Sequence, residues 1–311
     1  MTPKIIVVVG PTASGKSALA VRLARQFNGE VISADSRQVY RSLDVGSGKV
    51  KRDETKSSKL KAKSYLHQGI PHHLLDVASP KRTFTVARYK KLAEQATRDI
   101  ARRGRLPIFC GGTGFYLDAV FGQMAIPPVP PDRQLRARLE KLDGEKLFEK
   151  LEILDSARAK KIDRHNRRRL IRAIEVAAAL GHNVKGDPWN LIKGRPLDCL
   201  KIGLKMPGEK LKEQIKKRLH ERVRRGLIAE VKKLRQQGLS WQRLDNFGLD
   251  YRYASRYLRG LLTKQEMIRQ LQTAIWHYAK RQMTWFRRDR DIHWVENNLE
   301  AERLTRDFLR K

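Results

Sequence analysis

A phosphate-binding pattern stands near the start of the chain, directly after an apolar run at residues 5–9. Backbone N–H groups in such a loop, together with the positive end of the helix that follows, form a cradle for anions. Lys16 would reach the terminal phosphates, and the Ser17 hydroxyl would ligate Mg²⁺. A glycine turn that merely joined a strand to a helix would need neither side chain. We therefore predict that a polyphosphate or pyrophosphate binds to Gly10, Pro11, Thr12, Ala13, Ser14, Gly15, Lys16 and Ser17.

Two further segments place polar residues at the ends of predicted strands. The short apolar run 30–34 ends in Asp35, and the run 106–110 leads into the turn Gly111–Gly114, which contains Thr113. Strands that alternate with helices indicate a parallel sheet, and ligands bind beyond the carboxyl ends of its strands. We expect the phosphate loop, Asp35 and the glycine turn to meet in one crevice, the predicted active site.

The elements that position these residues predict an α/β fold: a P-loop NTPase-like parallel sheet flanked by helices, with a smaller all-helical insertion domain. The proline-rich run 126–131 suits neither a helix nor a central strand and marks a boundary. Helical patterns follow as far as about 181, and an apolar run at 199–204 then returns to the sheet. We predict a core P-loop domain at 1–125, a helical insertion at 126–189, and a second, mostly helical core segment at 190–311.

The net charge restricts the partners of the chain. Its 311 residues include 67 Lys and Arg against 33 Asp and Glu, a formal charge of +34. This excess favours a polyanionic partner whose binding weakens as salt rises, although a solvated basic face remains the alternative. Cys110 and Cys199 do not form a C-x-x-C pair, so no disulfide framework is indicated. No apolar run approaches about 18 residues, so we expect no membrane contact and a cytoplasmic location. Separately, we expect the chain to be a monomer.

Taken together, the motifs resemble one family, the bacterial tRNA dimethylallyltransferases, also called the IPP transferase family. The resemblance covers nearly the whole chain. Six motifs in order carry it: the phosphate loop, Ile32–Tyr40, Pro71–Asp76, Gly111–Tyr116, Arg168–Glu175 and Lys280–Arg287. These enzymes transfer a five-carbon prenyl group from dimethylallyl diphosphate to N6 of the adenosine beside the anticodon, nucleotide 37 of tRNA.

The resemblance implies a catalytic role for four residues. The phosphate loop would hold a diphosphate leaving group, and Lys16 and Arg218 would stabilise its developing charge together with Mg²⁺. Asp35 matches the family's general base, which accepts a proton from the adenine amino group. A metal-side or substrate-hydroxyl carboxylate remains open for Asp35. Thr113 matches a substrate-contacting threonine, and its alternative is a turn residue.

The same resemblance implies an extended RNA site. The adenine must leave the anticodon-loop stack to reach the crevice, where residues 35–38 and Thr113 would meet it. The insertion and the long predicted helix at 263–288 would hold the anticodon stem-loop, which accounts for the charge. The tRNA-binding residues expected are Asp35, Ser36, Arg37, Gln38, Thr113, Arg136, Arg168, Arg169, Leu170, Ile171, Arg172, Lys280, Arg281, Gln282, Met283, Thr284, Trp285, Phe286 and Arg287.

Three segments depart from the family's usual pattern. The segment 163–166 lacks a proline before the arginine cluster, and Gln214 replaces a frequent arginine. Asp250 interrupts a usual Gly-Tyr-Arg pattern, which leaves tRNA contacts of 247–252 open.

Three other functions share parts of the pattern. The first is a small-molecule P-loop kinase, which has no use for the positive charge and usually carries an acidic residue where the run 106–110 ends. The others are a non-catalytic RNA-binding protein with a relic loop and a free-adenylate prenyltransferase. The non-catalytic RNA-binding protein stays open at this point, whereas a free-adenylate prenyltransferase would not need the basic insertion.

Overall fold

The computed structural model describes residues 3–54, 65–122, 124–181 and 197–311. The chain forms two compact units, one built from 1–121 and 196–311 and the other from 122–195. The sequence placed the insertion at 126–189. Residues 182–196, between the predicted helical segment and the apolar run at 199–204, lie outside the described residues. Within them, no helix combines the length and the apolar character needed to cross a membrane.

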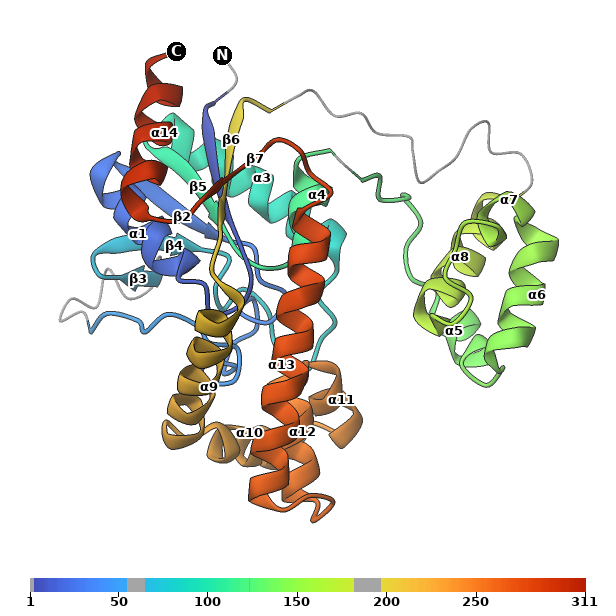
Figure 1. Ribbon diagram of the computed structural model, residues 1–311. Coiled ribbons are helices and arrows are strands. Elements are labelled where there is room, and N and C mark those ends of the chain that lie inside the picture. The colour runs from blue at the N-terminus through green and yellow to red at the C-terminus, as the bar shows by residue number, and fades with distance from the viewer. Residues whose placement is uncertain (1–2, 55–64, 123, 182–196) are drawn as a thin grey trace. The chain divides into compact units, whose positions relative to one another are not determined.

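A seven-stranded sheet forms the centre of the larger unit, in the order β3-β4-β2-β5-β1-β6-β7 (Figure 1). Neighbouring strands are parallel except for the β3/β4 pair at one edge. The predicted parallel sheet is confirmed, and β6 rejoins it beside β1 after the insertion. The strands are β1 Ile5–Val9, β2 Gly29–Ser33, β3 Tyr65–His67, β4 Ile70–His73, β5 Leu106–Cys110, β6 Cys199–Leu204 and β7 Ile292–Val295.

Both faces of the sheet are covered, so its central strands are apolar throughout. In β1, Ile6 and Val8 point to the face covered by α1 (Lys16–Gln26) and α14 (Asn298–Arg310). Ile5, Val7 and Val9 belong to the larger core on the other face. There the sheet packs against α3 (Val86–Arg102) and α4 (Gly114–Val120). Successive side chains of β1 therefore enter the two cores alternately.

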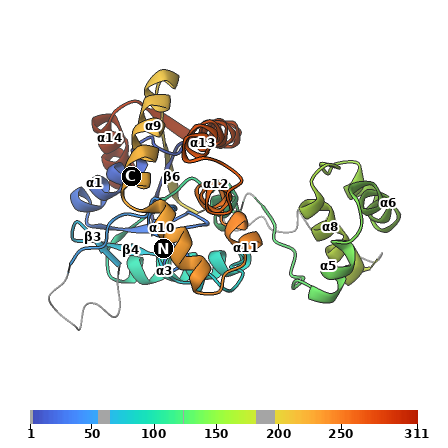
Figure 2. The same ribbon diagram turned by 90° about the horizontal axis from the view of Figure 1, so that it is seen from below.

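A helical layer extends the larger core beyond that edge of the sheet. The two long helices α9 and α13 lie side by side (Figures 1 and 2), and α13 also packs against α12. A Thr263/Glu266 capping box begins α13, which ends where the sequence predicted, within two residues. These helices are α9 Gly208–Arg224, α10 Leu227–Gln236, α11 Trp241–Asn246, α12 Leu249–Leu258 and α13 Lys264–Phe286.

The smaller unit is all helical and has its own core, centred on the contact between α6 and α8. Its charged centre is Glu175 of α8, whose side chain is buried and accepts hydrogen bonds from the Asp132 amide and from Arg136. Burial opposes ionisation of Glu175, but these hydrogen bonds outweigh it and lower its pKa. The helices are α5 Arg133–Leu139, α6 Gly144–Leu154, α7 Ser156–Ala159 and α8 Arg167–Leu180.

Candidate active site

The phosphate loop joins β1 to α1 in a conformation that bends the backbone sharply. Gly10 and Gly15 have φ of 149° and 92°, and Ala13 has φ of 68°. Helix α1 begins at Lys16, so its first amides face the space above the loop. The Ser14 hydroxyl is buried and has no hydrogen-bond partner within the described chain. A bound phosphate oxygen would supply the acceptor that this hydroxyl lacks.

Lys16 is the cation of the loop. Its Nζ donates to the Pro11 carbonyl over 3.1 Å. Burial lowers the pKa of Lys16, as does nearby Arg218, whereas Cys110 and Asp35 act in the opposite direction. A desolvated ammonium group close to a second cation is stabilised by a bound anion. The surroundings of Lys16 therefore favour binding of a phosphate group.

Asp35 lies two residues beyond the end of β2, and its side chain holds the loop that follows. Its Oδ1 accepts hydrogen bonds from the Arg37 amide over 2.8 Å and the Gln38 amide over 3.3 Å. The Thr113 hydroxyl oxygen accepts from the Ser36 amide at 3.1 Å, and the Thr113 amide donates to the Ala34 carbonyl at 3.1 Å. Thr113 therefore fixes the turn that presents Asp35, as well as beginning α4.

Gln282 of α13 connects the phosphate loop to the glycine turn. Its amide oxygen accepts from the Thr12 N–H at 2.8 Å, and its amide nitrogen donates to the Gly112 carbonyl at 2.8 Å. The side chain is buried, and a Cβ added at Gly112 would lie 2.2 Å from Gln282 Nε2. Because the protein occupies both ends of this amide, Gln282 holds the phosphate loop and the glycine turn together, and its predicted RNA contact stays a prediction.

A cavity of about 170 Å³ opens between the phosphate loop, the Asp35 loop and helices α9, α12 and α13. It is much smaller than the several hundred Å³ of a typical drug-sized site, and so suits one small group. Desolvation and the nearby Asp35 charge raise the pKa of Tyr278, one of its walls, to about 12. Its lining includes Thr12, Asp35, Arg37, Ser47, Arg222, Leu249, Asp250, Tyr251, Ile275 and Tyr278.

Two arginines on successive turns of α9 reach the same region. Arg222 Nε lies 2.9 Å from Asp250 Oδ1, and both side chains are largely buried. Part of the Arg218 side chain is exposed to solvent. Even so, desolvation by the surrounding protein and then the charge of Arg222 lower the pKa of Arg218. Asp250, the departure noted in the sequence, thus pairs with the second arginine beside the cavity, whereas Arg218 has no ion pair with a carboxylate among the described residues.

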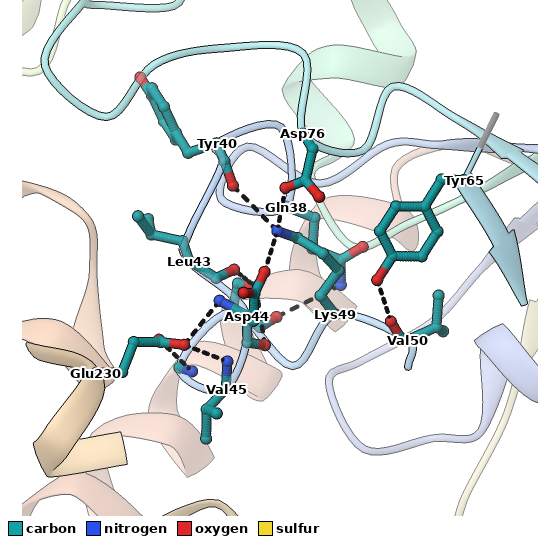
Figure 3. A network of polar contacts seen from close by, with 12 residues as sticks. Gln38, Tyr40, Leu43, Asp44, Val45, Lys49, Val50, Tyr65, Asp76 and Glu230 are labelled. Carbon is teal, nitrogen blue, oxygen red and sulfur yellow. Dashed lines mark hydrogen bonds and ion pairs between the residues drawn. The ribbon is translucent and has the colours of Figure 1, made fainter. Parts of the chain in front are cut away.

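The loop between Gln38 and Val50 forms one wall and is held by a polar network (Figure 3). The buried Lys49 ammonium contacts Asp44 at 2.7 Å, Asp76 at 2.5 Å and the Tyr40 carbonyl at 3.0 Å. From α10, the Glu230 carboxylate accepts the backbone N–H groups of Asp44, Val45 and Gly46 at 2.7–3.0 Å, as well as the Tyr251 hydroxyl at 2.9 Å.

Sequence reasoning missed Glu230, Lys49 and Arg222. They are single charges among many, and no local motif distinguishes a buried charge from a solvated one. The signal that could have found Arg222 is its position four residues after Arg218, on the same face of one helix.

The predicted RNA-binding residues of the smaller unit have different surroundings. Arg168 and Arg169 are exposed. Arg136 and Arg172 pair with Glu175 at 2.6 Å and 3.4 Å. Leu170 and Ile171 are buried in the core of the unit.

The predicted set on α13 is also divided between surface and interior. Lys280, Arg281, Thr284 and Arg287 are exposed, Met283 and Trp285 are half-buried, and Phe286 is buried with Gln282 in the core of the larger unit. Trp285 donates to Asp118 Oδ2 at 3.1 Å. The exposed members are therefore the ones available to a polyanion.

The donor set is compatible with Mg²⁺ held jointly with a substrate. Among the described residues, no group of three or more His, Cys, Asp or Glu side chains is arranged to hold a metal ion. Mg²⁺ typically keeps several waters and binds through one or two protein oxygens plus substrate phosphates. Ser17, exposed at the first turn of α1, offers such an oxygen beside the loop.

A parallel α/β sheet with a phosphate loop at the end of one strand and a carboxylate at the end of another defines a P-loop transferase, in which a phosphate ester and an acceptor meet in one crevice. The sequence model of the family described as IPP transferase matches residues 38–289. The chain belongs to this family, as its motifs had indicated.

Individual proteins agree with that assignment. A protein named tRNA dimethylallyltransferase 2 from Citrifermentans bemidjiense is 39% identical over 313 residues, which cover 99% of this chain and 96% of that protein. The crystal structure of the full-length tRNA isopentenylpyrophosphate transferase from Bacillus halodurans matches with a TM-score of 0.69 and 34% identity, over 99% of this chain and 97% of that one. A eukaryotic dimethylallyltransferase described as acting on tRNA matches with a TM-score of 0.73 and 25% identity, over 95% and 74% of the two chains.

Proposed function

We propose that the chain transfers a dimethylallyl group from dimethylallyl diphosphate to N6 of the adenosine at tRNA nucleotide 37, giving N6-(dimethylallyl)adenosine and diphosphate. The observation that carries this proposal is a cavity shared by the two predicted sites. Thr12 of the phosphate loop and Asp35 both line it. A donor held by its diphosphate and an acceptor held next to a base would meet there.

The loop and the α9 cations bind the donor. The diphosphate lies on the backbone N–H groups of residues 13 and 15–17 and between Lys16 and Arg218, where charge that develops on the leaving group is stabilised. The Ser17 hydroxyl would hold Mg²⁺ together with the diphosphate, and the ion would supply positive charge that offsets part of the charge on the leaving group. The five-carbon group extends from the diphosphate into the cavity.

Asp35 acts on the acceptor. The N6 lone pair attacks C1 of the allylic group, the C1–O bond breaks, and the bonding electrons leave with the diphosphate. N6 then carries an extra proton, which passes to the Asp35 carboxylate. Thr113 and the amides of Arg37 and Gln38 orient this carboxylate, because they fix the loop that carries it.

The exposed cations account for the choice of an RNA acceptor. Arg168 and Arg169 of α8, and Lys280, Arg281 and Arg287 of α13, provide contacts for the phosphates of the anticodon stem-loop. We propose that one monomer carries all the residues needed for the reaction, and that a tRNA substrate places that reaction in the cytoplasm.

Label transfer and nucleoside analysis test the proposal together. Unmodified tRNA is incubated with Mg²⁺ and either prenyl-labelled dimethylallyl diphosphate or γ-labelled ATP, and its nucleosides are then identified by mass. We expect the prenyl label at adenosine 37 and no phosphoryl transfer. Phosphoryl transfer from ATP would establish a kinase instead, and preferential prenylation of AMP over tRNA would establish a free-adenylate enzyme.

A further inference from the structure

A groove follows the exposed side of α13 outside the active-site cavity. It consists of two adjoining hollows, one of about 520 Å³ between α12 and α13 and one of about 360 Å³ between α13 and the end of α9. Both are lined by Arg269 and Thr273, so the two hollows adjoin at these residues, and together we call them the α13 groove.

The α13 groove begins at the edge of the active-site cavity. Leu249 lines both of them. Along α13, Ile275 and Tyr278 face the cavity, whereas the neighbouring His277 and Arg281 face the groove. At about 1.5 Å per residue, the helix carries the groove roughly 18 Å from Arg281 to Arg269. This length accommodates several nucleotides of a chain that enters the cavity.

The ionisable residues that line the groove are suited to a polyanion. Arg269, Arg281, His277 and His220 line it, and within the described residues no Asp or Glu does. Arg269 and Arg281 are exposed, and neither forms an ion pair with a carboxylate of the described chain. No neighbouring carboxylate of the described chain therefore neutralises these two charges, although the Arg281 guanidinium lies over the Tyr278 ring, 5.9 Å from its centre.

An aromatic side chain lies among these cations. Tyr253 of α12 lines the same hollow as Arg269, His277 and Arg281. Aromatic rings and guanidinium planes interleaved with cations are typical of surfaces that bind single-stranded RNA, because bases stack on the rings while phosphates contact the charges.

We propose that the α13 groove binds the ribose–phosphate backbone of the tRNA substrate beyond the reacting nucleotide, with Arg269 and Arg281 on phosphates and Tyr253 beneath a base. This inference rests on the proposed function, because it extends the acceptor site of the same reaction. The groove would guide the strand toward the cavity after the reacting adenine has left the stack.

Arg269→Ala tests the proposed contact between Arg269 and a tRNA phosphate. The informative quantity is the salt dependence of tRNA binding, which a purely structural role of Arg269 would not change. We expect the Kd and KM for unmodified tRNA to rise about five- to tenfold and the slope of log K against log salt to fall by about 0.7, one phosphate contact. The kcat at saturating tRNA and the KM for dimethylallyl diphosphate should stay unchanged.

Arg259→Ala, which removes an exposed arginine outside the groove, is the matched control. An unchanged Kd in Arg269→Ala, with wild-type prenylation of tRNA intact, would overturn the inference alone; absence of prenylation by the wild type would overturn the proposed function.

A crosslink identifies the occupant. Thr273 is exposed and lines both hollows, so Thr273→Cys in a Cys199→Ser background can carry a photoreactive group, while Cys110 is buried. We expect crosslinks to tRNA that excess unlabelled tRNA suppresses. Crosslinks between two copies of the chain that tRNA does not displace would show that the groove is a protein interface and would contradict the proposal.

Discussion

The amide oxygen of Gln282 lies 2.8 Å from the backbone nitrogen of Thr12, although 270 positions separate the two residues in sequence. Through the opposite end of the same amide, Gln282 also holds the Gly112 carbonyl. One side chain of α13 thus fixes the distance between the phosphate loop and the turn that carries Thr113. The donor cradle and the base-presenting turn are in this way coupled to the helix that carries the predicted RNA contacts.

Gln282→Ala is expected to impair donor use more than tRNA binding. The substitution leaves the Thr12 amide and the Gly112 carbonyl without their partner, at a cost of roughly 1–3 kcal/mol for each buried group. We expect a higher KM for dimethylallyl diphosphate and a lower kcat, with the Kd for tRNA within twofold of the wild type. Gln237→Ala, at an exposed glutamine, is the control. If Gln282 instead contacts RNA, the opposite result follows: tRNA affinity falls and the donor KM is preserved.

Asp35→Asn is expected to abolish prenyl transfer while preserving the binding of both substrates. Asparagine keeps an oxygen that can accept from the Arg37 and Gln38 amides, so the turn remains. It cannot take up the N6 proton, and the loss of a general base typically lowers the rate by roughly 10²–10⁴-fold. Single-turnover prenylation and tRNA binding are measured side by side. Turnover equal to that of the wild type would remove Asp35 from the mechanism.

The local parts of this site could be predicted from the sequence, because each lies within a strand and the turn that follows it. The phosphate loop and Asp35 are of this kind, as is the glycine turn that ends β5. The network around them could not be predicted. Gln282, Glu230 and the Arg222–Asp250 pair act across elements far apart in the chain, and their contacts depend on how α9, α12 and α13 dock beyond the sheet.

The RNA-binding predictions illustrate the same limit. A run such as Arg168–Arg172 matches a motif as a block, but a helix turns its residues to different sides. Arg168 and Arg169 face solvent, whereas Leu170 and Ile171 enter the core and Arg172 turns to Glu175. Periodicity can assign these faces only once the packing partner of the helix is known.

Gly111→Ala tests the close approach of the glycine turn to the Asp35 loop. A Cβ at this position would lie 2.1 Å from the Ala34 carbonyl oxygen, a backbone atom that cannot move without displacing Asp35. We expect loss of prenylation together with a clear drop in thermal stability. Gly144→Ala is the matched control, because a Cβ there meets nothing within 4 Å and its φ is not positive. Wild-type activity in Gly111→Ala would show that the turn is not constrained.

Asp118→Asn tests a pH dependence of stability. Burial raises the pKa of Asp118 from 3.8 to about 6, although the Trp285 hydrogen bond acts in the opposite direction. The folded state therefore binds this proton more tightly than the unfolded state, and the contribution of Asp118 to stability declines as the pH rises from about 4 to about 6. Urea unfolding at pH 4.5 and pH 7 should show that Asp118→Asn gains stability relative to the wild type at the higher pH. Asp99→Asn, at a half-exposed carboxylate, should show no such gain.

Glu175→Ala separates folding of the smaller unit from contact with RNA. The Glu175 carboxylate holds Arg136, Arg172 and the Asp132 amide, and removing one partner of a buried ion pair typically costs roughly 3–5 kcal/mol. Its pKa is lowered in the folded state, so this stabilisation is present above the ordinary pKa of 4.5 and is lost as the pH falls below it. Hydrogen exchange should reveal faster opening of α5 and α8 in the variant, with the larger unit unaffected and Glu152→Ala as an exposed control on α6.

The same variant decides how Arg136 contributes to tRNA binding. If Arg136 acts by maintaining the fold, Arg136→Ala and Glu175→Ala should weaken tRNA binding in proportion to the opening they cause, and neither should change the salt slope at a pH where the unit is folded. If Arg136 contacts a phosphate directly, Arg136→Ala alone should lower that slope by about 0.7. Because both guanidinium contacts of Arg136 are already made by Glu175 at 2.6 Å, we expect the first result.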